Sequence, residues 1–84
     1  MTTAPTMYGA MWCKDCRRSK ALLDGLGVPY VNVDLESEPD RVDEARDLAG
    51  RQNIPVISFA DGLVLVEPSD EDLTAALSER GLIP

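Results

Sequence analysis

A pair of cysteines, Cys13 and Cys16, constrains this chain more than any other feature of its sequence. They are the only cysteines among the 84 residues, and they lie between a short apolar run at 5–8 and a stretch with helical character. Residues three apart on a helix share a face, so the two thiols can approach to disulfide distance. A helix start offers unpaired N–H groups to the first thiolate, while the second thiol is shielded one turn inside. The spacing therefore predicts a redox pair.

Three other interpretations of the cysteines compete with this one. A zinc site needs about four ligands, and the chain has two cysteines and no histidine. A structural disulfide that closes so small a loop would stabilise the fold very little. The third alternative, that both cysteines are inert and packed in the core, is left open. It does not explain why half of the 8 Lys and Arg residues lie in this segment, namely Lys14, Arg17, Arg18 and Lys20. In a βαβ context the C-x-x-C spacing favours redox chemistry.

Length and charge limit the classes of protein to consider. At 84 residues, the chain is expected to form one domain over residues 1–84. Its net charge of -7 argues against nucleic acid or an anionic membrane as a partner. The sequence shows no export signal or membrane span, so we expect a cytoplasmic protein. In that reducing compartment a C-x-x-C pair is catalytic more often than structural.

The first half of the chain is expected to fold as strand, helix and strand. Residues 5–9 form the first strand, and a helix follows from residue 13 or 14 to 26, where Gly27 is placed to terminate it. The alternating run at 30–34 predicts a second strand, parallel to the first through the helical crossover. A βαβ unit results.

The second half is expected to add a helix, a hairpin and a last helix. The Ser37–Asp40 segment is a helix-start signature, and Gly50 marks the end of that helix. The Asp61-Gly62 dipeptide predicts a tight turn between two antiparallel strands. The strands and the final helix are expected at 54–59, 63–66 and 69–80.

These elements predict an α/β fold of order βαβαββα, in which a mixed four-stranded sheet is covered by three helices. The polar residues of the middle helix are interpreted as its solvated face: Asp43, Glu44, Arg46 and Asp47. The end of the first strand, and with it Cys13, should lie at the carboxyl edge of the sheet, where open α/β folds bind ligands.

Several stretches together resemble the glutaredoxin family, and within it the mycoredoxins of actinobacteria. The likeness spans Thr6 to Leu77 and implies the thioredoxin/glutaredoxin-like fold. It is carried by Trp12-Cys13-Lys14-Asp15-Cys16, Ile54-Pro55, Phe59-Ala60-Asp61-Gly62 and Glu67-Pro68-Ser69-Asp70.

The resemblance implies roles for individual residues. Cys13 matches the nucleophile that takes a small-thiol cap from a mixed disulfide, and Cys16 matches the resolving or modulating thiol. Pro55 matches a proline that is cis in this fold, which would offer the backbone of Ile54 to an extended substrate. The alternative is that Pro55 merely starts an edge strand.

Further residues are candidates for binding the small thiol. Ser69 and Asp70 fall near the place where glutaredoxins bind the amino-acid end of their thiol, although both could simply cap the last helix. Trp12 could pack against the sugar or peptide of the thiol, or could be a surface aromatic beside the disulfide. Lys14 adds a positive charge next to Cys13.

Two departures from the family pattern bear on the choice of thiol. Glutathione-using glutaredoxins commonly carry a lysine where this chain has Ala10, and a tyrosine where it has Asp15. Glutathione has two carboxylates for such a lysine to pair, whereas mycothiol has none, so the change favours mycothiol. Asp15 disfavours a thiolate on Cys13, while Lys14, Arg17 and the helix start favour it.

The sequence therefore predicts a thiol–disulfide oxidoreductase that binds no resident cofactor or metal and uses mycothiol, or glutathione, as thiol co-substrate. Its expected partners are mixed-disulfide proteins and a reductase that regenerates the thiol, and we expect a monomer. An alternative is a NrdH-redoxin-like dithiol donor that thioredoxin reductase reduces. An iron–sulfur cluster-binding module and a redox-inert interaction domain are further alternatives.

Overall fold

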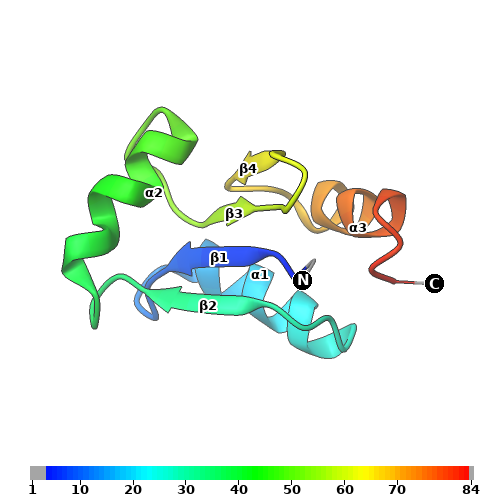
Figure 1. Ribbon diagram of the computed structural model, residues 1–84. Coiled ribbons are helices and arrows are strands. Elements are labelled where there is room, and N and C mark those ends of the chain that lie inside the picture. Colours follow the sequence, from blue (N-terminus) through cyan, green and yellow to red (C-terminus); the bar gives the residue numbers. More distant parts are fainter. Residues whose placement is uncertain (1–3, 84) are drawn as a thin grey trace.

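The computed structural model describes residues 4–83 and contains four strands and three α-helices (Figure 1). In chain order the elements are β1 (Thr6–Gly9), α1 (Lys14–Gly25), β2 (Val31–Asp34), the 3-10 turn η1 (Pro39–Arg41), α2 (Val42–Ala49), β3 (Val56–Ser58), β4 (Val64–Val66) and α3 (Asp70–Glu79). The predicted order βαβαββα is confirmed. Within residues 4–83, every helix is too short or too polar to cross a lipid bilayer.

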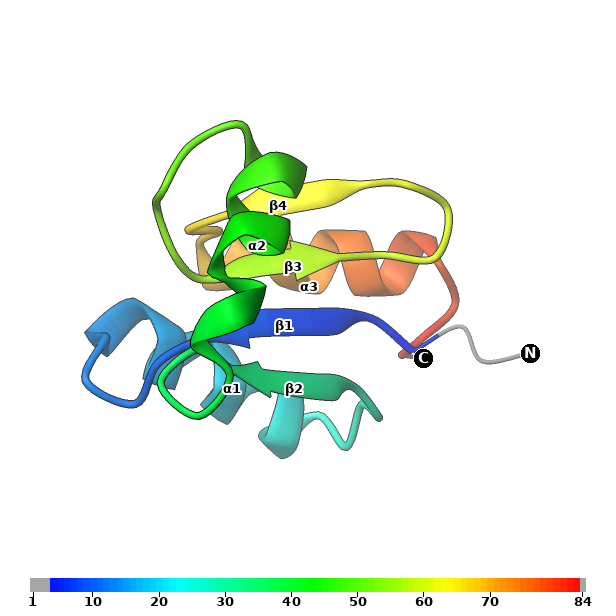
Figure 2. The same cartoon turned by 60° about the vertical axis from the view of Figure 1, so that its left-hand side comes forward.

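The four strands form one mixed sheet in the order β2-β1-β3-β4. Strand β1 is parallel to β2 and antiparallel to β3, and β4 is antiparallel to β3. Figure 2 shows α2 in front of the sheet and α1 and α3 behind it. The three helices thus cover the sheet, as the sequence predicts, with α2 on one face and α1 and α3 on the other (Figure 2).

The ends of the elements follow the predicted signals with small differences. Helix α1 ends at Gly25, one residue earlier than expected, and Gly27 then turns the chain at φ 68°. The strand predicted over 54–59 is shorter, because Pro55 has no N–H to donate to a neighbouring strand. The loop of the hairpin is closed by the Phe59 N–H, which donates to the Leu63 carbonyl at 2.8 Å.

The polar face of the middle helix α2 is not purely solvated, in contrast to the expectation from the sequence. It begins with the 3-10 turn η1, and it ends at Gly50 in the left-handed region, at φ 74°. The Glu44 carboxylate accepts a hydrogen bond from the Tyr8 hydroxyl of β1 and pairs with Arg41 at 2.8 Å. Glu44 therefore ties α2 to the sheet.

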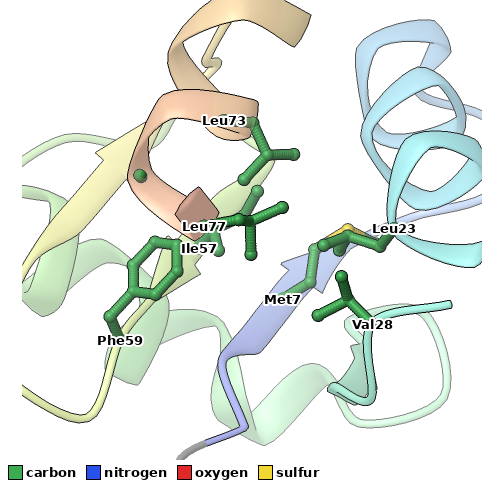
Figure 3. Packing of buried hydrophobic residues seen from close by; sticks show 8 residues of the cluster. Met7, Leu23, Val28, Ile57, Phe59, Leu73 and Leu77 are labelled. Atoms are coloured by element: carbon green, nitrogen blue, oxygen red, sulfur yellow. The ribbon is translucent and has the colours of Figure 1, made fainter. Parts of the chain in front are cut away.

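The main core lies between the sheet and the helices α1 and α3 (Figure 3). Leu23 from α1 and Leu73 and Leu77 from α3 are fully buried there, against Met7 of β1 and Ile57 of β3. Burial of apolar side chains of this size is the main source of stability in so small a domain. This packing fixes α1, and with it both cysteines, against the sheet.

The second face of the sheet is smaller and carries the alternate residues of the strands. Tyr8 of β1 and Val33 of β2 pack there against Ala45 of α2. Because side chains alternate along a strand, Met7 and Gly9 face α1 where Tyr8 faces α2. The last residue of β1 is therefore turned toward the cysteine helix.

Candidate active site

Cys13 occupies the N-cap position of α1, as predicted. Its backbone is extended, with φ -82° and ψ 116°, and its sulfur accepts the backbone N–H of Cys16 at 3.2 Å. The Cys13 thiol lies 3.8 Å from the carbonyl oxygen of Ile54. Its side chain is partly exposed, and both cysteines are free thiols. A sulfur at this position is reachable by a substrate and accepts a backbone N–H group of the first helical turn.

Cys16 lies one turn further into the helix and is buried, with only 3% of its surface exposed. Burial raises the pKa of the Cys16 thiol to about 12, and the neighbouring Cys13 and Asp15 act in the same direction. A backbone interaction with Ala10 acts in the opposite direction. At neutral pH, Cys16 is therefore a protonated thiol behind the exposed one.

Gly9 makes room for Cys16 at the end of β1. A Cβ atom placed on Gly9 would lie 2.9 Å from the Cys16 sulfur and 3.1 Å from its Cβ. At 2.9 Å, either the Cys16 side chain or the strand would have to shift, so glycine at this position lets the helix approach the strand this closely. The sequence marked Gly9 only as the end of a strand.

The segment before β3 completes the surroundings of Cys13. The Ile54–Pro55 peptide is cis, which confirms the prediction for this bond. The Pro55 carbonyl accepts the Glu67 N–H at 2.9 Å, and the Glu67 carboxylate accepts a hydrogen bond from the Asn53 side chain. These two contacts fix the segment that places the Ile54 carbonyl beside the Cys13 sulfur.

Arg18 joins the cysteine helix to the start of α3. Its guanidinium lies 3.3 Å from the Asp15 carboxylate and 3.6 Å from that of Asp70, and it donates to the Pro68 carbonyl at 3.2 Å. The positive charge predicted near the thiols is thus shared with two carboxylates. Arg18 brings the 68–70 segment, far away in sequence, next to the redox pair.

Two more of the predicted cations are also engaged by nearby groups. The Arg17 guanidinium donates to the Met11 carbonyl at 2.6 Å and so holds the turn before Cys13. The Lys20 ammonium binds Asp24 at 3.2 Å and the Tyr30 hydroxyl at 2.8 Å. The Lys20 ammonium is therefore paired with Asp24 and Tyr30 rather than with either thiol.

The candidate thiol-binding side chains lie at the starts of α1 and α3. Trp12, 69% exposed, and the exposed Lys14 flank it at the start of α1. Ser69 is the N-cap of α3, where its hydroxyl accepts the Asp72 N–H at 3.1 Å, and Asp70 is exposed. The capping role of Ser69 is therefore confirmed, and a second role in binding stays a prediction.

Comparison with known proteins identifies the family. A sequence model of the glutaredoxin family matches residues 6–64. The chain belongs to the glutaredoxin family. Proteins named as glutaredoxins in two Mycobacterium tuberculosis strains, CDC 1551 and H37Rv, are 32% identical to it over 78 residues, covering 92% of this chain and 93% of theirs.

Solved glutaredoxin structures share the fold. A glutaredoxin from Archaeoglobus fulgidus superposes with a TM-score of 0.77 at 20% identity, covering 88% of this chain and 85% of that one. A buckwheat glutaredoxin, solved as a complex with glutathione, superposes with a TM-score of 0.67 at 26% identity, covering 95% and 81%. This glutaredoxin is accordingly a thiol–disulfide oxidoreductase that acts on protein disulfides with a small thiol.

The sequence found both cysteines of this glutaredoxin but missed Gly9 and the linking role of Arg18. A glycine that ends a strand just before the redox pair was the available signal for Gly9. No local signal predicts Arg18, because its partners Pro68 and Asp70 are about fifty residues away and meet it only through the packing of α1 and α3.

Proposed function

We propose that this glutaredoxin reduces mixed disulfides between proteins and mycothiol, with Cys13 as the nucleophile. The observation that carries this proposal is the unequal placement of the two thiols. Cys13 is partly exposed and accepts an N–H group at the helix start, whereas Cys16 is buried. This difference in exposure supports Cys13, rather than Cys16, as the sulfur that meets a substrate of protein size.

The reaction follows from this arrangement. The Cys13 thiolate attacks the small-thiol sulfur, the disulfide bond to the protein breaks, and the protein sulfur leaves with the electron pair and takes up a proton. Cys13 is then disulfide-bonded to the small thiol. A second small thiol attacks this bond and leaves as the small-thiol disulfide, or Cys16 attacks Cys13 and releases the small thiol. A reductase outside this chain returns the disulfide product to the thiol.

The substrate is expected to lie along the segment before β3. The Ile54 carbonyl, 3.8 Å from the Cys13 sulfur, can accept a hydrogen bond from an extended substrate, in the manner of an added strand. The side chains proposed to contact the small thiol are Trp12 and Lys14 at the start of α1 and Ser69 and Asp70 at the start of α3.

Mycothiol is favoured over glutathione by the side chains near Cys13. Ala10, at the position where glutathione-using relatives commonly carry a lysine, is 6% exposed and offers no charge to a carboxylate. The Asp70 carboxylate is exposed at the start of α3 and repels an anionic thiol, although Arg18 partly compensates it. The relatives in Mycobacterium tuberculosis add support from sequence.

A parallel turnover assay tests the choice of thiol. The reduced protein is assayed with one protein substrate carrying either a mycothiol or a glutathione mixed disulfide, each with its matching thiol and reductase. We expect kcat/KM to be higher for the mycothiol substrate. Replacing Ala10 with lysine should narrow the difference by raising the glutathione value. Equal values for both thiols, or a preference for glutathione, would contradict the proposal.

A dithiol electron donor is the second candidate. It is favoured by one observation: both cysteines are free and lie one helical turn apart, as a donor that cycles through an internal disulfide requires. Thioredoxin reductase with NADPH should then reduce the oxidised protein rapidly, whereas mycothiol with its own reductase should not.

A further inference from the structure

A small cavity lies beside Cys16. Its volume is about 30 Å³, and its walls come from α1, from the end of β1 and from β2. The lining includes Gly9, Cys16, Lys20, Asn32 and Asp34. A water molecule needs about 10–15 Å³ of such space and a few polar partners, so the cavity can hold one.

The pairing of β1 with β2 places Asp34 beside Cys16. Gly9 is directly opposite Asp34 in the parallel ladder. The Cβ direction of Gly9 points at the Cys16 sulfur, which a side chain there would approach to 2.9 Å. Paired residues on neighbouring strands project from the same face, and the strands are about 4.8 Å apart. Asp34 therefore projects toward α1 next to the buried sulfur.

The Asp34 carboxylate is held in place and keeps capacity to accept a proton. One oxygen accepts the Glu36 N–H and the other accepts the Ser37 hydroxyl, both at 3.0 Å. Each carboxylate oxygen has a second acceptor site. Of the described residues that line the cavity, Asp34 is the only one with a carboxylate, and the Lys20 ammonium is bound to Asp24 and Tyr30.

Cys16 needs such a group when it acts as a nucleophile. It is 3% exposed, and burial raises its pKa to about 12, so bulk solvent removes its proton slowly at neutral pH. The charged groups next to it on α1 do not help, since Asp15 disfavours the thiolate and so does Cys13. The cavity offers a route for the proton to Asp34, which lines it together with Cys16.

We propose that Asp34 accepts the proton of Cys16, through a water molecule in this cavity, when Cys16 attacks a mixed disulfide on Cys13. The inference rests on the proposed roles of the two cysteines. The Cys16 thiol gives its proton to the water molecule, which passes a proton of its own to Asp34. The Cys16 sulfur then forms a bond to the Cys13 sulfur. The bond from Cys13 to the small thiol breaks, and that sulfur leaves with the electron pair and is protonated by solvent. Asp34 then returns its proton to solvent.

The reaction of the fully reduced protein with DTNB allows the attack by Cys13 and the attack by Cys16 to be followed separately. A first thionitrobenzoate ion is released when Cys13 attacks the reagent, and a second when Cys16 resolves the adduct on Cys13. Asp34→Asn keeps an oxygen acceptor for the Glu36 N–H but cannot take a proton. We expect it to slow the second release by about tenfold or more at pH 7 and to leave the first unchanged.

The pH dependence distinguishes proton transfer from a structural effect. Without Asp34, hydroxide must remove the proton, so the second release in Asp34→Asn should rise about tenfold per pH unit between pH 6 and 8, more steeply than in the wild type. Asp34→Ser, which also keeps an acceptor, should behave like Asp34→Asn. Ser37→Ala, which removes one bond of the carboxylate but keeps it, should retain a second release close to the wild-type rate.

Each outcome is decisive. The role of Asp34 would be overturned by any of three results. In Asp34→Asn, the second release could occur at the wild-type rate, or its rate could depend on pH as in the wild type. In Ser37→Ala, the second release could be slowed as much as in Asp34→Asn. A missing first release in the wild type would instead contradict the proposed role of Cys13, and the two failures are therefore distinguishable.

Discussion

Cys13 and Cys16 are identical side chains one helical turn apart, yet they lie in opposite surroundings. Cys13 caps α1, is partly exposed and accepts the Cys16 N–H at 3.2 Å. Cys16 is 3% exposed and packs over Gly9, where burial raises its pKa to about 12. The difference shows that the position of the helix start relative to the sheet, rather than residue type, sets the chemistry of each sulfur.

The largest effect is expected from exchanging the sulfur of one cysteine for oxygen. Cys13→Ser should lower the rate of mixed-disulfide reduction by about 10³-fold or more, because a serine hydroxyl is not ionised near neutral pH. Cys16→Ser should stay within about tenfold of the wild type, since a second small thiol can clear Cys13. Turnover of a mycothiolated protein measures both.

The reverse pattern is the informative failure. If activity survives in Cys13→Ser, or is lost in Cys16→Ser alone, Cys13 is not the nucleophile. Both variants are to be compared at equal folded fraction, measured by circular dichroism, so that a loss of activity is not a loss of fold.

The second effect concerns the contact that buries Cys16. Gly9→Ala should lower the free energy of unfolding by about 1–3 kcal/mol, because the added Cβ would lie 2.9 Å from the Cys16 sulfur. Gly25→Ala is the matched control: it has open space around its Cβ position, and a helical alanine is favoured over glycine. It should leave stability unchanged or raise it by up to about 1 kcal/mol.

A double-mutant cycle sharpens this comparison. Cys16→Ala removes the nearer of the two clashing atoms, so Gly9→Ala should cost less in a Cys16→Ala background than in the wild type. Urea unfolding of the four proteins measures the coupling. If the two substitutions are additive, Gly9 and Cys16 are not in contact as described.

The smallest effect is expected from pH. The pKa of Cys16 is raised in the folded protein to about 12, so folding favours the protonated thiol. This contribution to stability is fully present below the unfolded pKa of about 9 and is lost as pH rises toward 12. Wild-type stability should therefore fall between pH 8 and 10 more than that of Cys16→Ala. Parallel pH curves for the two proteins would argue against a buried thiol.

Much of the fold could be predicted because its signals are local. The C-x-x-C pair marked the start of α1, Gly27 and Gly50 both adopt the left-handed conformation that ends a helix, and Asp61-Gly62 lies in the loop of the β3–β4 hairpin. Strand lengths are predicted less accurately, since Pro55, which has no N–H, and the hairpin loop shorten β3 in ways that the alternation of apolar residues does not show.

The candidate site was predicted in part for the same reason. The positions of Cys13 and Cys16 follow from helix geometry, but the contacts of Gly9 and Asp34 depend on the lateral register of β1 and β2 and on how closely α1 approaches them. The partners of Arg18 depend on the packing of α1 against α3. A single sequence carries no local signal for such long-range contacts.

Alkylation of the reduced protein tests the central claim most directly. A short treatment with iodoacetamide at pH 7, followed by mass spectrometry of the peptides, assigns the modified sulfur. The unequal surroundings of the two thiols predict modification at Cys13 and a Cys16 that stays unmodified until the protein is unfolded. Modification of Cys16 at the same rate as Cys13, or ahead of it, would contradict the division of roles between them.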